Sequence, residues 1–242
     1  VCPQLFVAVF YDLSLPFKMI KLVVHSLLLA GFLHTWYLDY KYLPPSALLI
    51  EGQPLSRLGW LTMIDMTLQT IYHFVAILVV LFGFQESCRR FKFFGQVLVG
   101  PIGVAVAVLF WGLWTFDPHT LAKDATAMKL VEIRPWNHGL HTLPAISAFI
   151  DVIIWRRPNP NFSCVFKTII GFVFVYIGDI YLINYLSGGN WPYPILAQLD
   201  TVGRIAFYAF AIAIVLACYG VLALFNRLVH GDLSEKEKTK RQ

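Results

Sequence analysis

The chain has 242 residues, of which 58% are hydrophobic and only 14% are charged, with a formal net charge of +5. Soluble globular domains carry about 25% charged residues, so this composition excludes a water-soluble domain and predicts an integral membrane protein. The four cysteines are widely spaced and form no CxxC pair, which argues against a disulfide framework or a cysteine zinc site. The sequence begins with Val1 rather than methionine, so we expect residues to precede it.

Six apolar segments are long enough to cross a bilayer core, which takes roughly 20 helical residues. They cover residues 18–38, 60–84, 93–116, 136–155, 165–187 and 201–226. We therefore predict an all-α fold in which residues 1–242 form one domain, a bundle of six transmembrane helices. The first span is the weakest because His25 and His34 interrupt it. Residues 4–11 are too short to span and are predicted to lie at the membrane interface.

Six crossings place both termini on one side of the membrane. That side carries 13 of the 19 lysines and arginines, and the opposite side carries 6. Because cytoplasmic loops are enriched in Lys and Arg, we predict cytoplasmic termini, with residues 227–242 as a charged cytoplasmic tail. The basic excess then reflects topology and attraction to lipid headgroups, so we expect no nucleic-acid partner. The endoplasmic reticulum and the plasma membrane fit this pattern equally well.

Polar residues recur along one face of the second predicted span. Thr62, Asp65, Gln69 and His73 follow the spacing of a single helix face. Ionisable groups within hydrocarbon cost kilocalories of free energy and mark functional sites by default. Hydrogen bonding between helices is the alternative role for such a face, and the pattern leaves both interpretations open.

The fourth predicted span opens with the sequence WNHGLHTLP, residues 136–144. Its two histidines, His138 and His141, share a helix face, and Asn137 is predicted to be the N-cap. At about 1.5 Å of rise per residue, Thr62 and His141 lie at similar depth near the outer membrane edge. Contact between them is therefore feasible.

The last two predicted spans bring more polar groups to the same outer half. Asp179 and Asn184 lie toward the outer end of the fifth span, and Arg204 lies in the first turn of the sixth. Trp191 and Tyr193, between these spans, are expected to be interfacial anchors, as such rings usually are.

Three chemistries fit these residues. Thr62 and His141 could act as nucleophile and general base. A metal ion could instead bind His138, His141 and a carboxylate such as Asp65 or Asp179, as in catalytic zinc sites. Haem ligation by two histidines is the third, although no histidine pair stands at matched depth in an obvious four-helix pattern. Spacing alone ranks the metal site equal to the hydrolase, and a non-catalytic membrane regulator or scaffold is a further alternative.

Three stretches of the chain resemble a known family. WLTMIDMTLQTIYH (60–73), WNHGLHTLP (136–144) and NWPYPILAQLDTVGRIAFY (190–208) resemble the androgen-induced-gene family, whose members include the androgen-dependent regulator of tissue factor pathway inhibitor. The resemblance runs from Trp60 to the end of the sixth span, and the first 59 residues carry little of it. It implies a six-helix threonine hydrolase, without a cofactor, that cleaves fatty acid esters of hydroxy fatty acids.

Matched motif by motif, the resemblance implies that Thr62 is the nucleophile and His141 the general base, with an acyl-threonine intermediate. The lipid substrate is expected to enter laterally from the bilayer, its free carboxylate near Arg204. Asp65 is expected to orient the site or to pair with Arg204. The remaining candidates for orienting or pocket roles are Gln69, His138, Asp179 and Asn184.

Overall fold

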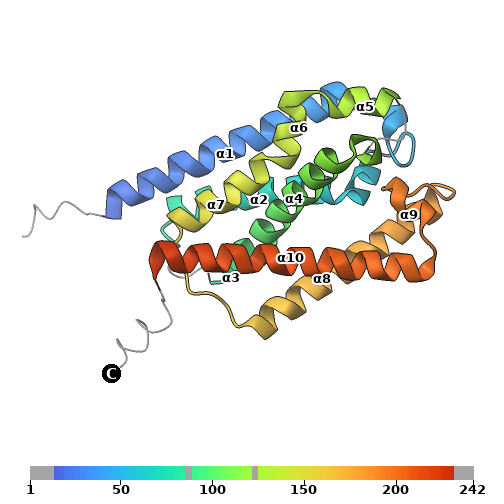
Figure 1. The fold of residues 1–242 in the computed structure, drawn as a ribbon. Helices are drawn as coiled ribbons and strands as arrows, with labels where there is room; N and C mark the ends of the chain where they lie inside the picture. The colour runs from blue at the N-terminus through green and yellow to red at the C-terminus, as the bar shows by residue number, and fades with distance from the viewer. Residues whose placement is uncertain (1–13, 85–88, 122–124, 232–242) are drawn as a thin grey trace, which may run out of the picture.

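The structure is a computed structural model that describes residues 14–84, 89–121 and 125–231 (Figure 1). Within these ranges the chain forms helices, turns and loops and no strand, so the all-α prediction is confirmed for the described residues. The predicted interfacial segment 4–11 and the tail from residue 232 onward lie outside them.

Five helices make up most of the structure: α1 (Ser14–Tyr42), α2 (Leu61–Leu81), α4 (Gly100–Phe116), α8 (Phe162–Leu186) and α10 (Thr201–His230). The shorter helices are α3 (Arg89–Phe94), α5 (Ala125–Val131), α6 (Arg134–His141), α7 (Leu143–Ile154) and α9 (Pro194–Gln198). Shorter elements join them: the 3-10 helices η2 (Pro45–Ala47), η3 (Pro54–Gly59) and η5 (Pro118–Leu121), and the π-helical η4 (Gly95–Val99) between α3 and α4.

Five stretches of helix in the described residues are long and apolar enough to cross a membrane, which fits a multi-pass membrane protein. They are Pro16–Tyr42, Leu61–Leu81, Arg89–Phe116, Phe162–Leu186 and Thr201–His230. The start of α1 and the end of α10 lie at the same end of the bundle (Figure 1), as an even number of crossings requires. Six crossings and cytoplasmic termini stay predictions.

The fourth predicted span, 136–155, is not one continuous helix. α6 ends at His141 and α7 begins at Leu143. Pro144 causes the break, because it has no backbone N–H to bond the Leu140 carbonyl and its ring crowds that carbonyl. α7 alone has 12 residues, or about 18 Å of helix against a hydrocarbon core of about 30 Å.

The histidines of the first span do not interrupt it, since α1 is continuous through both. His34 is exposed, whereas His25 is fully buried and its Nδ1 lies 2.8 Å from Nδ1 of His73 on α2. Trp155 donates its indole N–H to His25 Nε2 at 2.8 Å, and His73 Nε2 lies 2.7 Å from the Ser147 hydroxyl. His25 and His73 therefore stand at the same depth on two neighbouring helices, a pairing that the sequence did not indicate.

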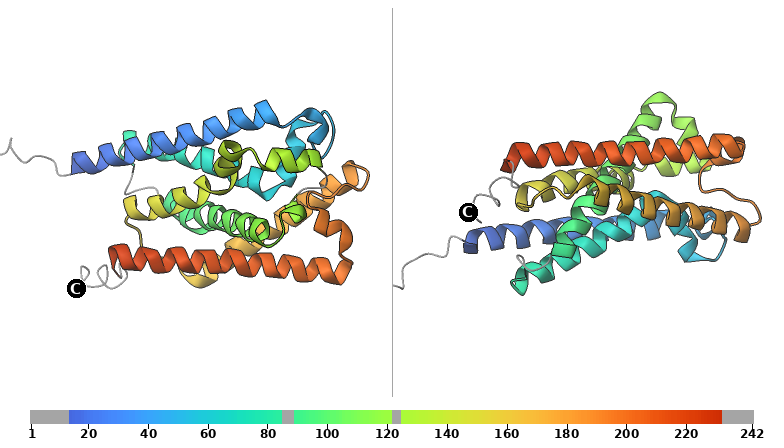
Figure 2. Two further views of the ribbon diagram at one scale, coloured as in Figure 1. Left: turned by 45° about the horizontal axis from the view of Figure 1, so that its top comes forward. Right: turned by 90° about the horizontal axis from the view of Figure 1, so that it is seen from below.

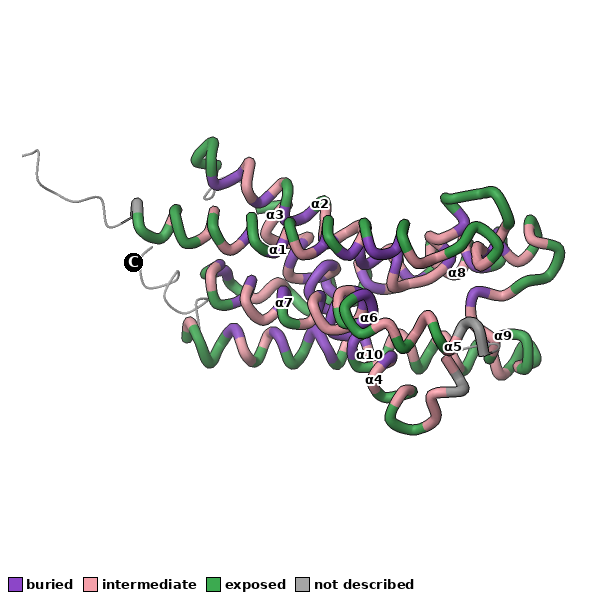
Figure 3. Tube along the Cα trace, turned by 90° about the horizontal axis from the view of Figure 1, so that it is seen from above, coloured by how far each residue is buried: buried purple, intermediate pink, exposed green. Residues whose placement is uncertain are grey.

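α1 and α10 lie at opposite edges of the bundle, with α4 and α7 between them (Figures 1 and 2). α4 packs against α7 and α10, and α1 packs against α2. Buried residues gather along the centre, while the outer faces of α1 and α10 are largely exposed (Figure 3). These exposed faces carry large apolar side chains such as Leu27 of α1 and Val202 and Leu228 of α10, as expected of helices that face lipid.

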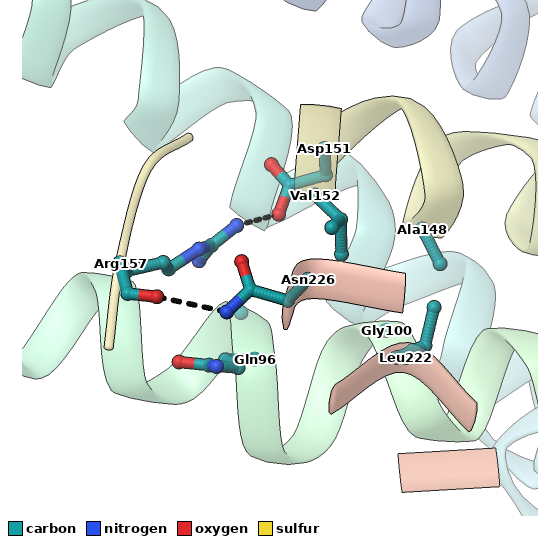
Figure 4. A pocket seen from close by; sticks show the side chains of 9 residues that line it. Gln96, Gly100, Ala148, Asp151, Val152, Arg157, Leu222 and Asn226 are labelled. Carbon is teal, nitrogen blue, oxygen red and sulfur yellow. Dashed lines mark hydrogen bonds and ion pairs between the residues drawn. The ribbon is translucent and has the colours of Figure 1, made fainter. Parts of the chain in front are cut away.

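A buried polar cluster lies near the end of the bundle where α10 finishes (Figure 4). Arg157 pairs with Asp151 and donates to the Lys92 carbonyl at 2.9 Å. Tyr72 donates its hydroxyl to Asp151 at 2.8 Å, and Asn226 donates its amide to the Arg157 carbonyl at 2.9 Å. A cavity of about 10 Å³ beside these groups is at the lower limit for one water molecule.

The contact between α1 and α6 requires a glycine. A Cβ built on Gly139 would lie 2.7 Å from Cγ2 of Thr35 on α1, closer than packed carbon atoms approach. We expect Gly139→Ala to lower the free energy of unfolding by about 1–3 kcal/mol through overpacking. Gly112→Ala on α4 is the matched control, since nothing lies within 4 Å of its Cβ and alanine favours a helix. Equal thermal midpoints for the two variants would contradict the close contact.

Candidate active site

The structure brings Thr62 and His141 together from helices that are far apart in sequence. Thr62 is the second residue of α2 and His141 is the last residue of α6. The Thr62 hydroxyl oxygen lies 3.4 Å from His141 Nε2, and both side chains are part-buried. Trp60 adopts an extended conformation (φ −89°, ψ 126°) just before α2, so the helix begins immediately beside the threonine.

Asn137 fixes the tautomer of His141. His141 Nδ1 lies 2.6 Å from the Asn137 side-chain oxygen and 3.1 Å from the Asn137 carbonyl. A carbonyl can only accept, so Nδ1 carries the proton and Nε2 presents its lone pair to Thr62. The Asn137 amide nitrogen donates to the Val131 carbonyl at 2.9 Å, which sets the orientation of the amide. Thr62, His141 and Asn137 therefore form a connected hydrogen-bond network.

Aromatic rings of α4 hold the two histidines of α6 in different places. Phe110 stacks on the His141 ring with centroids 3.6 Å apart and an interplanar angle of 10°, which fixes the imidazole plane. His138 lies against Trp111 with centroids 5.1 Å apart, and its Nδ1 lies 2.9 Å from the Thr142 hydroxyl. The exposed His138 is thus turned toward α4 and Thr142 rather than toward Thr62.

The segment before α9 holds the start of α2. The Tyr193 hydroxyl accepts the Leu61 N–H at 2.7 Å, and Trp60 donates its indole N–H to the Pro192 carbonyl at 3.0 Å. The Tyr176 hydroxyl, 3.1 Å from that of Tyr193, donates to the Gly59 carbonyl at 3.0 Å. Burial raises the pKa of the Tyr193 phenol, so the group stays protonated. That Tyr193 is an interfacial anchor stays a prediction, and the structure shows in addition that its hydroxyl supports the backbone next to Thr62.

One backbone N–H at this helix start is free. Leu61 donates to Tyr193, while Met63 and Ile64 both donate to the Trp60 carbonyl. Within the described part of the chain, the Thr62 N–H has no hydrogen-bond acceptor. The first N–H groups of a helix lack intrahelical partners, and a donor of this kind can stabilise a developing oxyanion.

Asp65 and Gln69 belong to a buried hydrogen-bond series rather than to the Thr62–His141 pair. Ser147 donates to the Gln69 side-chain oxygen at 3.2 Å, and Gln69 donates to Asp65 at 3.3 Å. The second Asp65 carboxyl oxygen is buried and has no partner among the described residues. Asn137, not Asp65, contacts the distal nitrogen of His141, so the expectation that Asp65 orients the imidazole is not met.

The candidates on α8 and α10 lie apart from Thr62 in the contacts that the structure shows. Asp179 and Asn184 each keep a buried side-chain atom that has no hydrogen-bond partner in the described ranges. Arg204 donates its Nε–H to the Leu196 carbonyl at 2.9 Å and lies over the ring of Trp191. The expected pairing of Asp65 with Arg204 is therefore wrong.

The metal and haem alternatives find no matching arrangement. The described residues contain no group of three or more His, Cys, Asp or Glu side chains placed to hold a metal ion, so His138, His141 and a carboxylate do not converge. The facing nitrogens of His25 and His73 are 2.8 Å apart. A metal ion bound between these two nitrogens, with bonds of about 2.0–2.1 Å to each, would hold them much farther apart. The observed separation is that of a hydrogen bond.

Sequence reasoning assigned Asn137 the wrong role. The structure begins α6 at Arg134, with Ile133 as N-cap, so Asn137 lies inside the helix. The sequence nevertheless contained an indication of the Asn137–His141 contact. The two residues are four positions apart, and such pairs are neighbours on a helix surface.

Comparison with known proteins agrees with the resemblance seen in the motifs. The family model described as FAR-17a/AIG1-like protein matches residues 20–227. The human androgen-dependent TFPI-regulating protein is 23% identical over 77% of this chain and 83% of its own length, and the mouse protein of that name is 28% identical over 85% and 93%. The human androgen-induced gene 1 protein is 27% identical over 62% of this chain and 67% of its length.

No solved structure matches the chain. The family model covers far more than half of the sequence and includes both helices that supply Thr62 and His141. The chain belongs to the FAR-17a/AIG1-like protein family.

Proposed function

We propose that the protein is an intramembrane lipid hydrolase that cleaves an ester through a Thr62 nucleophile and a His141 general base. The observation that carries the proposal is the 3.4 Å approach of the Thr62 hydroxyl to His141 Nε2, with the opposite ring nitrogen bonded to Asn137. A nucleophile within reach of a base, itself oriented by a third group, is the arrangement that acyl-transfer enzymes share. Membership of the family supports a membrane hydrolase.

Acylation begins with attack of the Thr62 oxygen on the ester carbonyl carbon. His141 Nε2 takes the hydroxyl proton as the new C–O bond forms. The carbonyl oxygen becomes an oxyanion, and the free Thr62 N–H is the donor available to stabilise it. When the tetrahedral intermediate collapses, the ester C–O bond breaks and His141 returns the proton to the departing hydroxyl group.

Deacylation reverses these roles with water. His141 takes a proton from a water molecule, whose oxygen attacks the acyl-Thr62 carbonyl. Collapse of the second intermediate returns the proton to the Thr62 oxygen and releases a carboxylic acid. The Nδ1–H bond to Asn137 stabilises the imidazolium that forms in both steps.

The proposed substrate class is the one that the family resemblance implies, and the location of the site supports it. We propose fatty acid esters of hydroxy fatty acids, branched lipids with the ester in the middle of a hydrocarbon chain. Thr62 and His141 lie within a bundle whose outer faces are apolar, which supports a lateral approach of the lipid from the bilayer with its tails in hydrocarbon.

Hydrolysis of such an ester by the purified protein in lipid nanodiscs tests the proposal, together with two Asn137 variants. Asn137→Leu removes the nearer acceptor of His141 Nδ1 and leaves only the Asn137 backbone carbonyl at 3.1 Å. We expect kcat to fall about 100-fold, because an imidazole that is less firmly oriented is a much poorer general base. Asn137→Asp keeps an acceptor oxygen at the same place, and we expect it to retain activity within about tenfold.

Thermal midpoints of both variants serve as the control for folding. Loss of activity in Asn137→Leu with recovery in Asn137→Asp, at similar midpoints, is the expected result. Equal activity in wild type and Asn137→Leu would exclude the assigned positioning role. No hydrolysis by the folded wild-type protein would refute the proposed function itself.

A further inference from the structure

Arg204 is held in a fixed place near the start of α10. Its Nε–H donates to the Leu196 carbonyl at 2.9 Å, and its guanidinium carbon lies 4.3 Å from the centroid of the Trp191 ring. Trp191 in turn meets Tyr181 of α8 edge-on, with centroids 5.2 Å apart. Three elements thus define the plane and position of a half-buried guanidinium.

The terminal nitrogens of Arg204 have no acidic partner among the described residues. Asp200 lies one turn away, but its carboxylate accepts the Gly203 N–H at 2.7 Å as the N-cap of α10. Asp179, on the neighbouring α8, also forms no ion pair within 4.0 Å in the described ranges. One turn further along α10, the Tyr208 hydroxyl is buried and has no hydrogen-bond partner there.

The guanidinium is tied to the segment that supports Thr62. The Tyr193 hydroxyl bonds the Leu61 N–H, next to Thr62, and the Leu196 carbonyl bonds Arg204. Tyr193 and Leu196 are joined by a single turn, with the Leu196 N–H donating to the Tyr193 carbonyl at 3.0 Å. The backbone beside Thr62 and the guanidinium of Arg204 are therefore connected through one tyrosine side chain and one helical turn.

We propose that Arg204 binds the free carboxylate of the lipid whose ester Thr62 cleaves, a role that rests on the proposed function. The terminal nitrogens of an arginine form a planar fork that matches a carboxylate with two hydrogen bonds. A single cation balances one carboxylate charge, whereas a phosphate carries up to two. The lipid carboxylate is thereby held at a set distance from the catalytic pair, so Arg204 selects where along the chain the cleaved ester lies.

Two substrates that differ only in the free carboxyl group test the proposal. One is hydroxystearic acid esterified at its hydroxyl with oleic acid, and the other is the methyl ester of that same lipid. We expect Arg204→Gln to raise KM for the acid about 10- to 100-fold, which is the affinity lost when a charge-assisted hydrogen bond is removed. For the methyl ester we expect KM to change by no more than about twofold. Arg204→Lys keeps the positive charge but not the planar pair of donors, and its KM for the acid is expected to lie between those of wild type and Arg204→Gln. Lys129→Gln removes the charge of an exposed side chain and is the matched control.

A binding measurement separates this proposal from the hydrolase proposal. Thr62→Ala in nanodiscs is expected to bind the radiolabelled acid, and laurate is expected to compete better than lauryl alcohol or dodecyl phosphate. Adding Arg204→Gln to Thr62→Ala should abolish the advantage of laurate over lauryl alcohol. The carboxylate site would be overturned if Arg204→Gln raised KM equally for the acid and the methyl ester, or for neither. Stronger competition by dodecyl phosphate than by laurate would also overturn it. If wild type cleaves neither lipid but the binding preference holds, only the hydrolase proposal fails.

Discussion

Thr62→Ala is expected to abolish ester hydrolysis, lowering kcat by about 1,000-fold or more while the protein stays folded. Loss of a nucleophile typically costs several orders of magnitude in rate, and what remains comes from binding and oxyanion stabilisation. The substitution deletes a hydroxyl that is 3.4 Å from His141 Nε2 and leaves the Asn137–His141 contact intact. Turnover in nanodiscs measures the loss of hydrolysis, and the thermal midpoint shows whether the variant stays folded.

Two other threonine variants show whether the loss belongs to the nucleophile. Thr62→Ser retains a hydroxyl but loses the β-branch that stiffens χ1, and we expect it to keep partial activity. Thr67→Ala removes a hydroxyl that donates to the Met63 carbonyl of its own helix, and we expect near-normal turnover. Full activity in a folded Thr62→Ala variant would eliminate Thr62 as the nucleophile.

Arg157→Met is expected to lower the free energy of unfolding by about 3–5 kcal/mol, because it leaves the Asp151 carboxylate buried without its cation. The side chains of Arg157 and Asp151 are 3% and 8% exposed. The same substitution removes the donor to the Lys92 carbonyl. The cluster links the end of α7 to α3 and, through Asn226, to α10, so its loss should loosen that end of the bundle. Thermal unfolding in detergent micelles measures the change.

Two further variants separate the buried pair from a general charge effect. Arg157→Met combined with Asp151→Leu replaces both charges by apolar groups, and most of the stability should return, since such exchanges are often neutral. Arg156→Met changes the adjacent, exposed arginine and should have little effect. If Arg156→Met and Arg157→Met lowered the midpoint equally, the ion pair would not stabilise the fold.

The long helices could be predicted from the sequence because hydrophobic runs of spanning length are a strong and local signal. The segments 60–84 and 201–226 correspond to α2 and α10 with ends displaced by a few residues. The break in the fourth span was also encoded locally, by Pro144. It was missed because the apolar run continues on both sides of the proline, and hydropathy does not register a missing N–H.

The candidate site was only partly predictable, because side-chain partners depend on how helices rotate against one another. Equal depth placed Thr62 and His141 near the same membrane edge, and the packing of α6 against α2 and α4 turned them toward each other. The contact of His25 with His73 needed the same information. The buried polar residues His25, Thr35 and Asp39 do recur at the spacing of one face of α1, but this spacing does not show which helix that face meets. Tyr193 was assigned to the interface because nothing in its neighbours indicates that its hydroxyl accepts the Leu61 N–H.

Labelling of the purified protein with a fluorophosphonate, followed by mass spectrometry of the modified peptide, tests the Thr62–His141 mechanism most directly. The reagent phosphonylates an activated hydroxyl and releases fluoride, so it reports the nucleophile whatever the natural ester is. We expect one modified residue, Thr62, with labelling lost in Thr62→Ala and in His141→Ala at equal folded yield. Labelling that persists in both variants, or that maps to another residue such as Ser147, would contradict it.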